Sequence, residues 1–217
     1  MGNNAKFIVD WGLPIIGLVF ILALYILYRL NRKHKYYLPK GFLGYFGSIT
    51  LIFLLLISLM AFNKVMTIKP RISEVIYALE NLKGKPAPSQ SFQLVGNMET
   101  KSIEDYKGNF VLLNFWATWC APCIKEMPEL NKLYDNYKDQ GLIVLTLSDE
   151  TSERVLKFME KHEIKTVSAV TEKFNWCDIQ TERPITFLLD KEGVIVDYFT
   201  GGYGYNYFEN KINKHIK

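Results

Sequence analysis

The chain has 217 residues, of which 49% are hydrophobic and 22% charged, and its formal net charge is +4 at pH 7. From Asn63 onward the charges nearly cancel, with 20 Lys and Arg against 21 Asp and Glu, so the basic excess belongs to the preceding residues. This distribution gives no electrostatic support for a nucleic-acid partner. Two long apolar stretches leave about 135 to 155 residues, enough for one domain with a hydrophobic core.

The first apolar stretch, Trp11–Tyr28, contains 18 uncharged residues. As a helix it would be roughly 27 Å long at ~1.5 Å per residue, just enough for a bilayer core. The preceding segment is weakly basic and no small-x-small cleavage site follows, which favours a retained transmembrane helix over a signal peptide. The second stretch, Gly41–Phe62, has 22 uncharged residues and predicts another transmembrane helix. Residues 1–62 are therefore expected to form a membrane anchor.

The connection between these stretches carries five basic residues and no acidic one: Arg29, Arg32, Lys33, Lys35 and Lys40. The positive-inside rule places such a loop in the cytoplasm, so both ends of the chain are expected on the outer side. The sequence thus predicts a multi-pass protein of the cytoplasmic membrane whose C-terminal domain faces the periplasm or the cell exterior.

A juxtamembrane segment, residues 63–83, follows the anchor. Apolar residues at helical spacing predict an amphipathic helix in its second half: Ile72, Val75, Ile76, Leu79 and Leu82. This helix is expected to lie on the membrane or to cap the domain, as a packed linker rather than a partner site. The sequence GKPAPSQS then interrupts the helix with two prolines and a glycine and opens a domain at residues 84–217.

Strand and helix patterns alternate within this domain. Apolar runs predict strands at Phe92–Val95, Phe110–Trp116, Leu142–Ser148, Val167–Val170, Ile185–Asp190 and Val194–Phe199. Helical patterns predict helices at Pro122–Asp139, Ser152–His162 and Tyr207–Ile216. The alternation indicates an α/β domain.

Two cysteines three residues apart follow the predicted strand Phe110–Trp116, in the sequence FWATWCAPCIKEMPEL. The pattern places Cys120 at a strand-to-helix turn and Cys123 one turn into the helix. The N–H groups and the positive dipole end at a helix N-terminus stabilise a thiolate, so Cys120 is expected to be the attacking sulfur. Cys123 is expected to resolve the mixed disulfide, and Pro122 to stiffen the loop between the sulfurs. This predicts a dithiol that cycles to a disulfide.

A zinc site is the structural alternative for two nearby cysteines. It would need two further soft ligands, and the remaining candidates are not paired in the sequence: Cys177, His34, His162 and His215. We therefore expect no metal and no cofactor other than the Cys120–Cys123 disulfide. Cys177 is expected to be a small buried residue rather than a third redox cysteine.

The sequence FWATWCAPC, the apolar strand before it and the later sequence RPITFLLDKEG occur in the order found in a known family. In these motifs the chain resembles the thioredoxin fold and, within it, the membrane-anchored TlpA/ResA-like thiol-disulfide oxidoreductases. The similarity extends from about Gly84 to Lys217 and begins with GKPAPSQSFQL. It implies a central mixed sheet flanked by helices, preceded here by the two expected transmembrane helices.

The resemblance also implies substrate-binding residues. The cis-proline of thioredoxin-like proteins, which lies beside the cysteines and helps to hold the substrate chain, corresponds to Pro184. The family often has a small or β-branched residue before this proline, whereas Arg183 places a cation near the dithiol. Trp119 is expected to be an exposed ring flanking the substrate groove, and Pro122 belongs to the same predicted surface.

A second departure, this time from thioredoxin itself, concerns the group that handles protons. Thioredoxin has a buried aspartate six residues before its first cysteine, whereas this chain has Asn114, an amide that cannot take a proton. Glu126 is similar in position to a glutamate of ResA-like members and is a candidate to relay the proton of Cys123. The alternative, a solvated helix carboxylate paired with a lysine, stays open here.

The function that the resemblance implies is a membrane-tethered oxidoreductase acting on disulfides of extracytoplasmic proteins. The usual direction in the family is reduction, often of apocytochrome c before haem attachment, with electrons from a membrane thiol carrier. Two alternatives remain: a disulfide-forming oxidant, and a non-enzymatic chaperone or binding module. A peroxiredoxin is disfavoured, because the P-x-x-x-T/S-x-x-C pattern precedes neither Cys120 nor Cys123.

Overall fold

The computed structural model describes residues 14–15, 17–23, 25–26, 29, 42–176 and 183–216. The chain forms two compact units, Met1–Glu74 and Val75–Lys217. The first predicted transmembrane stretch, Trp11–Tyr28, lies partly outside the described residues, and so does nearly all of the basic loop after it. Cys177 also lies outside them.

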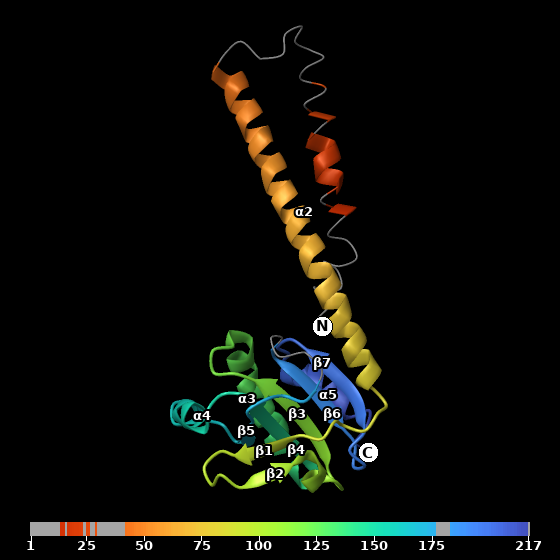
Figure 1. Cartoon of the computed structure of the whole chain (residues 1–217), viewed down its shortest axis with the longest axis vertical. Helices are drawn as coiled ribbons and strands as arrows, with labels where there is room; N and C mark the ends of the chain where they lie inside the picture. Colours follow the sequence, from red (N-terminus) through yellow and green to blue (C-terminus); the bar gives the residue numbers. More distant parts are fainter. Residues whose placement is uncertain are drawn as a thin grey trace. The chain divides into compact units, whose positions relative to one another are not determined.

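Helix α2, Phe42–Leu82, contains the second apolar stretch and the predicted linker helix in one element (Figure 1). The sequence predicts a boundary at Phe62, where the apolar run stops. The helix instead continues through Pro70 to Leu82, and Gly84, with a positive φ of 78°, lies just beyond its end. In the part of the chain that is described, no helix is long and apolar enough to cross a membrane.

A mixed sheet of seven strands forms the centre of the Val75–Lys217 unit, in the order β2-β1-β5-β4-β3-β6-β7. The strands are β1 (Ser91–Leu94), β2 (Thr100–Ser102), β3 (Phe110–Trp116), β4 (Leu142–Ser148), β5 (Val167–Val170), β6 (Ile185–Leu189) and β7 (Ile195–Thr200). β3, β4 and β5 are parallel neighbours, and the remaining pairs are antiparallel. The predicted strands are all present, whereas β2 was not predicted, because its sequence TKS carries no apolar signal.

The register of β3 brings three segments to one end of the sheet. In the parallel pair, Trp116 lies opposite Ser148, so the loops that follow β3 and β4 leave the sheet together. In the antiparallel pair, Phe115 lies opposite Ile185, so the start of β6 is at the same end. We call residues 117–120, between β3 and α3, the cysteine loop. This loop therefore lies beside the loop after β4 and beside Pro184.

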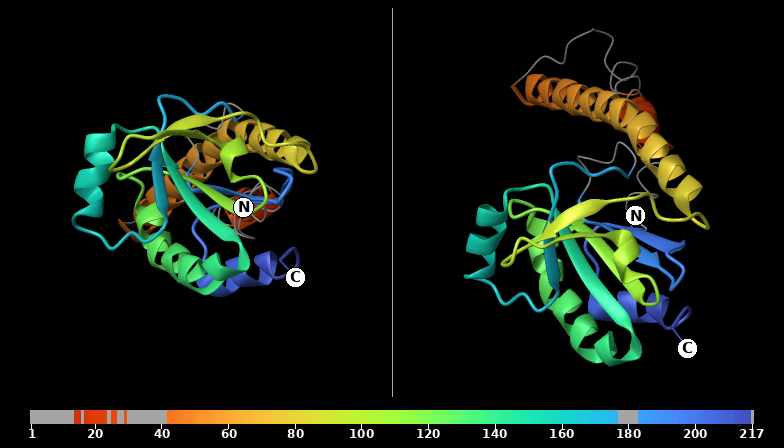
Figure 2. Two further views of the ribbon diagram at one scale, coloured as in Figure 1. Left: turned by 90° about the horizontal axis from the view of Figure 1, so that it is seen from below. Right: turned by 60° about the horizontal axis from the view of Figure 1, so that its bottom comes forward.

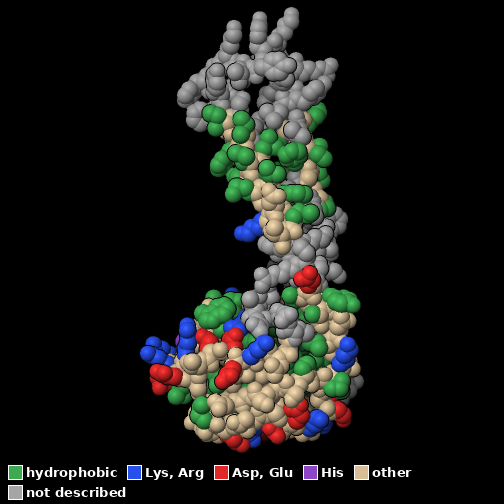
Figure 3. All heavy atoms as spheres, in the orientation of Figure 1, with side chains coloured by type: hydrophobic (Ala, Val, Ile, Leu, Met, Phe, Trp, Pro, Cys, Tyr) green, Lys and Arg blue, Asp and Glu red, His purple; other side chains and the backbone are tan. Residues whose placement is uncertain are grey.

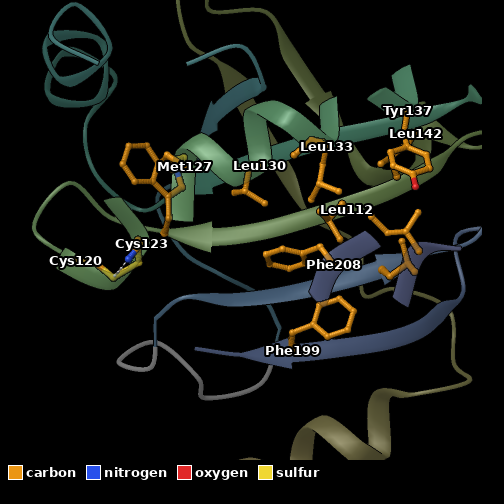
Figure 4. Close-up of a cluster of buried hydrophobic side chains, with 14 of the residues drawn as sticks. Leu112, Cys120, Cys123, Met127, Leu130, Leu133, Tyr137, Leu142, Phe199 and Phe208 are labelled. Carbon is orange, nitrogen blue, oxygen red and sulfur yellow. Dashed lines mark hydrogen bonds between the residues drawn. A yellow bond between two sulfur atoms is a disulfide. The ribbon is translucent and has the colours of Figure 1, made fainter. Parts of the chain in front are cut away.

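Helices α3 (Ala121–Tyr137) and α5 (Tyr205–Ile212) lie side by side along one face of the sheet (Figure 2). The short helix α4 (Ser152–Met159) contributes to the same buried cluster, which includes Leu112, Leu130, Leu133, Phe199 and Phe208 (Figure 4). Two short 3-10 helices, η1 (Ile103–Tyr106) and η2 (Lys138–Gln140), complete the helical elements.

The opposite face of the sheet is covered partly by the last turns of α2. Side chains of β3 alternate between the faces, so Val111 and Leu113 point away from Leu112 and join a second buried cluster. Leu79 of α2 is fully buried in this second cluster. The linker helix therefore packs against the domain, as the sequence predicted, and helices flank both faces of the sheet.

Charged side chains of both signs are interspersed on the visible face of the Val75–Lys217 unit (Figure 3). That mixture agrees with the near balance of charges after Asn63 in the sequence.

Candidate active site

The two cysteines lie where β3 gives way to α3. Cys120 is the N-cap residue of α3, and its Sγ accepts a hydrogen bond of 3.3 Å from the backbone N–H of Cys123 (Figure 4). The sulfurs form a disulfide whose Cα atoms are 5.3 Å apart. Pro122 occupies the first turn, where its missing N–H costs no helical hydrogen bond. The predicted strand-to-helix turn and redox disulfide are thus present.

The sulfurs differ slightly in burial. Cys120 is 4% exposed and Cys123 is 1% exposed in the disulfide form. The helix N-terminus directs N–H groups at Cys120, which is the arrangement that stabilises a thiolate after reduction. The roles of Cys120 as attacking sulfur and Cys123 as resolving sulfur stay predictions.

Glu126, one helical turn after Cys123, is buried, with only 2% of its surface exposed. Its Oε1 accepts from the side-chain amide of Asn114 and its Oε2 from the backbone N–H of Tyr203, both at 2.9 Å. Burial raises the pKa of Glu126 from 4.5 to about 8, although the two hydrogen bonds oppose that rise. The alternative of a solvated carboxylate is therefore wrong, because the first turns of α3 face the sheet.

Asn114 lies in the middle of β3 and is also buried. Its Nδ2 donates to Glu126 and, at 2.9 Å, to Oγ1 of Thr186, its cross-strand partner in β6. The sequence indicates only that a proton acceptor is lost at this position. Its role in holding Glu126 was missed, although an amide within an otherwise apolar strand was a visible signal.

The turn after β7 closes over the same carboxylate. A Cβ atom on Gly202 would lie 3.1 Å from the carbonyl oxygen of Pro122, so this glycine permits a close approach to the first turn of α3. The approach carries the N–H of Tyr203 to Glu126. This turn was not predicted, although the sequence GGYG at residues 201–204 is a turn signal.

The peptide bond between Arg183 and Pro184 is cis, as the resemblance implied. Pro184 is buried directly before β6, and its carbonyl oxygen accepts a 2.9 Å hydrogen bond from the N–H of Gly201. Since Ile185 pairs with Phe115 of β3, this proline lies at the cysteine end of the sheet. Its role in holding a substrate chain stays a prediction.

Arg183 does not extend into solvent. Its side chain is 4% exposed, and its guanidinium forms an ion pair with Asp149. The guanidinium carbon also lies 5.2 Å from the ring centroids of both Trp119 and Phe174. Arg183 is thus beside the residue that precedes Cys120, and Asp149 compensates its charge. Trp119 itself is 59% exposed, in agreement with the prediction of an open ring.

Within the described residues, no group of three or more His, Cys, Asp and Glu side chains is arranged to hold a metal ion.

The sheet order, the cis-proline and the Cys-x-x-Cys pair at a helix N-terminus together define a thioredoxin-fold dithiol protein. The chain belongs to the AhpC/TSA family, whose family model matches residues 83–198. Its relatives place it more narrowly. The thiol-disulfide oxidoreductase ResA of Bacillus cereus is 39% identical over 123 residues, which cover 54% of this chain and 69% of that protein.

Two further comparisons agree. The thioredoxin-like protein YneN of Bacillus subtilis is 33% identical over 135 residues, covering 60% of this chain and 79% of that protein. The solved thioredoxin domain of a thiol-disulfide oxidoreductase from Bacteroides vulgatus aligns with a TM-score of 0.54 and 27% identity, covering 62% of this chain and 98% of that chain. The chain is therefore an enzyme, a thiol-disulfide oxidoreductase of the ResA type, and the alternative of a non-enzymatic module is not retained.

Proposed function

We propose that this oxidoreductase reduces disulfides of proteins outside the cytoplasm. The observation that carries the proposal is the surroundings of Glu126, a buried carboxyl group one turn below the dithiol. Its two hydrogen-bond donors are the neutral amides of Asn114 and Tyr203. When such a carboxylate ionises, it disfavours a second negative charge on the nearby sulfurs. A less stable thiolate makes the dithiol a stronger electron donor.

The charge of Arg183 does not oppose this effect strongly. A cation near Cys120 would stabilise the thiolate and make the dithiol more oxidising. The ion pair with Asp149 compensates that cation. The balance of charges near the dithiol therefore supports a reductant over a disulfide-forming oxidant.

The reaction follows from the positions of these groups. The Cys120 thiolate attacks a substrate disulfide, and one substrate sulfur leaves as a thiolate. The Glu126 carboxylate takes the proton of the Cys123 thiol, and the resulting thiolate attacks Sγ of Cys120. The second substrate sulfur then leaves, so two electrons have passed to the substrate and the Cys120–Cys123 disulfide has formed.

Redox titration tests the direction. For comparison, thioredoxin has a potential of about −270 mV and the oxidant DsbA about −120 mV. We expect the Cys120–Cys123 couple to lie below roughly −200 mV and the reduced protein to cleave the disulfides of insulin. Glu126→Gln should raise the potential above about pH 8, where the wild-type carboxyl group is ionised, and change it little near pH 7. A wild-type potential close to that of DsbA would instead establish the oxidant.

We further propose that residues 1–62 tether the domain to the cytoplasmic membrane, with the domain on its outer side. The two uncharged stretches and the basic connection between them support this proposal. Labelling of intact cells with a membrane-impermeant thiol reagent tests it. A cysteine placed at Asn3 should react and one placed at Lys35 should be protected; the reverse pattern would refute the topology.

Apocytochrome c is the substrate that we propose to examine first, with a membrane thiol carrier as electron donor. Both follow from the resemblance to TlpA/ResA-like proteins. The Cys123→Ser variant should retain its natural substrate as a mixed disulfide on Cys120, because the resolving sulfur is absent. Identification of trapped proteins without any apocytochrome c would exclude that substrate.

A further inference from the structure

Two consecutive carboxylates, Asp149 and Glu150, follow β4 directly. Because Trp116 and Ser148 are partners in the parallel register, these carboxylates leave the sheet beside the loop that leads to Cys120. Their side chains contact different parts of the site. Glu150 bonds to the cysteine loop, and Asp149 pairs with Arg183, the residue before the cis-proline.

Glu150 holds the backbone of the cysteine loop. Its Oε2 accepts a 2.6 Å hydrogen bond from the N–H of Thr118, and its Oε1 accepts a 2.8 Å bond from the Thr118 hydroxyl. The side chain of Arg154 pairs with the same carboxylate at 2.9 Å and donates to the Thr118 hydroxyl at 3.2 Å. The residue directly before Trp119 is thereby anchored at both its backbone and its side chain.

Asp149 acts on the Trp119 ring through Arg183. The Asp149 carboxylate pairs with the guanidinium, which lies between the rings of Trp119 and Phe174 at 5.2 Å from each centroid. Phe174 is itself fixed, since it is buried and packs edge-on against Phe115 of β3 with a centroid separation of 4.6 Å. The guanidinium is therefore located from two sides, and the exposed Trp119 ring is the movable partner.

We propose that Asp149 is a positioning residue for substrate: it holds Arg183 against Trp119, so that the ring is oriented next to Cys120 to receive a protein chain. The inference rests on the oxidoreductase activity and holds for either direction of electron flow. It assigns Arg183 a role in docking, through the orientation of Trp119.

Loss of the Asp149 charge would remove the ion pair between Asp149 and the Arg183 guanidinium. A guanidinium that is nearly excluded from water is costly to leave beside a neutral group, so Asp149→Asn favours its movement toward solvent. Movement removes the cation–π contact with Trp119, and the ring then samples several orientations. Docking of a large substrate suffers because the ring must be ordered again on binding. A small disulfide, which needs only the sulfur of Cys120, is unaffected.

The test compares a protein disulfide with a small neutral one, using the purified full-length chain. For Asp149→Asn we expect the KM for insulin to rise roughly three- to tenfold, the equivalent of one lost cation–π contact. At a pH where Cys120 is fully ionised in both proteins, the kcat for insulin and the rate with hydroxyethyl disulfide should stay within about twofold. Arg183→Lys, which keeps the charge but not the planar stacking group, should reproduce the KM effect. The double variant should have about the same insulin KM as either single variant, because both substitutions remove the same Arg183–Trp119 contact.

Two controls separate this role from general damage. Asp135→Asn makes the same chemical change at a surface pair, in which Asp135 and Lys165 are 2.7 Å apart. It should change neither the KM for insulin nor the rate with hydroxyethyl disulfide. Trp119→Phe should raise the insulin KM in the wild-type background and have a smaller effect in the Asp149→Asn background. An unchanged insulin KM in Asp149→Asn would overturn the proposal, and so would an equal loss with both substrates. If the docking proposal is wrong, wild-type protein still reduces hydroxyethyl disulfide. Loss of that activity would instead mean that the dithiol is not functional.

Discussion

The side-chain amide of Asn114 donates a 2.9 Å hydrogen bond to Oε1 of Glu126, joining the middle of β3 to the helix that carries the dithiol. Both residues are buried, so the pair lies in a region of low polarity. The NH2 group of Asn114 donates to the carboxyl group, and an amide does not take up its proton. The pair therefore fixes the position of a proton-transfer group without competing for the proton, whereas a second carboxyl group at position 114 would share it.

The first prediction concerns stability and pH. Burial raises the pKa of Glu126 from 4.5 to about 8, so between these values the folded protein keeps a proton that the unfolded chain has lost. The free energy of unfolding must then fall as the pH rises from about 4.5 to 8, by on the order of 3 to 5 kcal/mol at most. Glu126→Gln should remove this part of the dependence. Urea unfolding of both proteins at pH 5 and pH 8 measures this difference. An equal change in the free energy of unfolding between the two pH values would contradict the prediction.

The second prediction concerns turnover. Glu126→Gln should slow the resolution step about 10- to 100-fold, because the amide cannot accept the proton of Cys123. The rise of the rate with pH near 8 should also disappear. Single-turnover reduction of insulin across pH 6 to 9 gives both quantities. Glu129→Gln, at the next turn of the same helix, is the matched control, because Glu129 is partly exposed and bonds to Lys132 and to the N–H of Tyr205, whereas Glu126 is buried and bonds to Asn114 and Tyr203. If the pH profile of Glu126→Gln matched that of wild type, proton relay by Glu126 would be excluded.

The third prediction concerns Asn114. The hydrogen bond from its amide lowers the pKa of Glu126, so Asn114→Ala should raise that pKa further and shift the pH profile of turnover upward. Thr186 loses the same donor, and we expect the free energy of unfolding to fall by about 1–3 kcal/mol. Asn131→Ala serves for comparison, since Asn131 is a buried amide of α3 bonded to Glu163 and Lys165. It should lose stability without a change of pH profile; a shift equal to that of Asn114→Ala would undermine the assignment.

Several parts of this architecture could be predicted because their signals are local. The apolar runs gave the strands, and the Cys-Ala-Pro-Cys spacing after β3 predicted a dithiol at a helix N-terminus. The cis peptide bond before Pro184 required the family resemblance, since an isolated X-Pro bond is usually trans.

Other parts depend on contacts between distant segments. Glu126 is joined to Asn114 of β3 and to Tyr203 after β7, and no spacing in the sequence indicates that these three meet. The environment of Arg183 is similar, since Asp149 and Trp119 come from two other loops. The continuity of α2 through Phe62 was missed for a different reason: the fall in hydrophobicity after Phe62 is not a helix stop signal.

The fourth prediction concerns the turn after β7. An alanine at Gly202 would place its Cβ 3.1 Å from the Pro122 carbonyl oxygen, so the turn must move away from α3. We expect Gly202→Ala to weaken the Tyr203–Glu126 hydrogen bond, to lower stability by about 1–2 kcal/mol and to raise the pH at which turnover increases. Gly204→Ala is the comparison, because a Cβ there has no atom within 4 Å; as the N-cap of α5 it should lose some stability but keep the wild-type pH profile. Equal stability and equal pH profiles for the two variants would show that the close approach is unimportant.

The last prediction separates the roles of the two sulfurs. Cys120 caps α3 and its Sγ receives the N–H of Cys123, so the reduced form should hold its thiolate at Cys120. Iodoacetamide should therefore alkylate Cys120 at least about tenfold faster than Cys123 near pH 7, since thiolate content governs the rate. Cys120→Ser should abolish insulin reduction, whereas Cys123→Ser should attack once and stop as a mixed disulfide. Mass spectrometry of the alkylated peptides and of the trapped species measures both effects. Equal alkylation rates, or a stable mixed disulfide on Cys123 of the Cys120→Ser variant, would reverse the assignment.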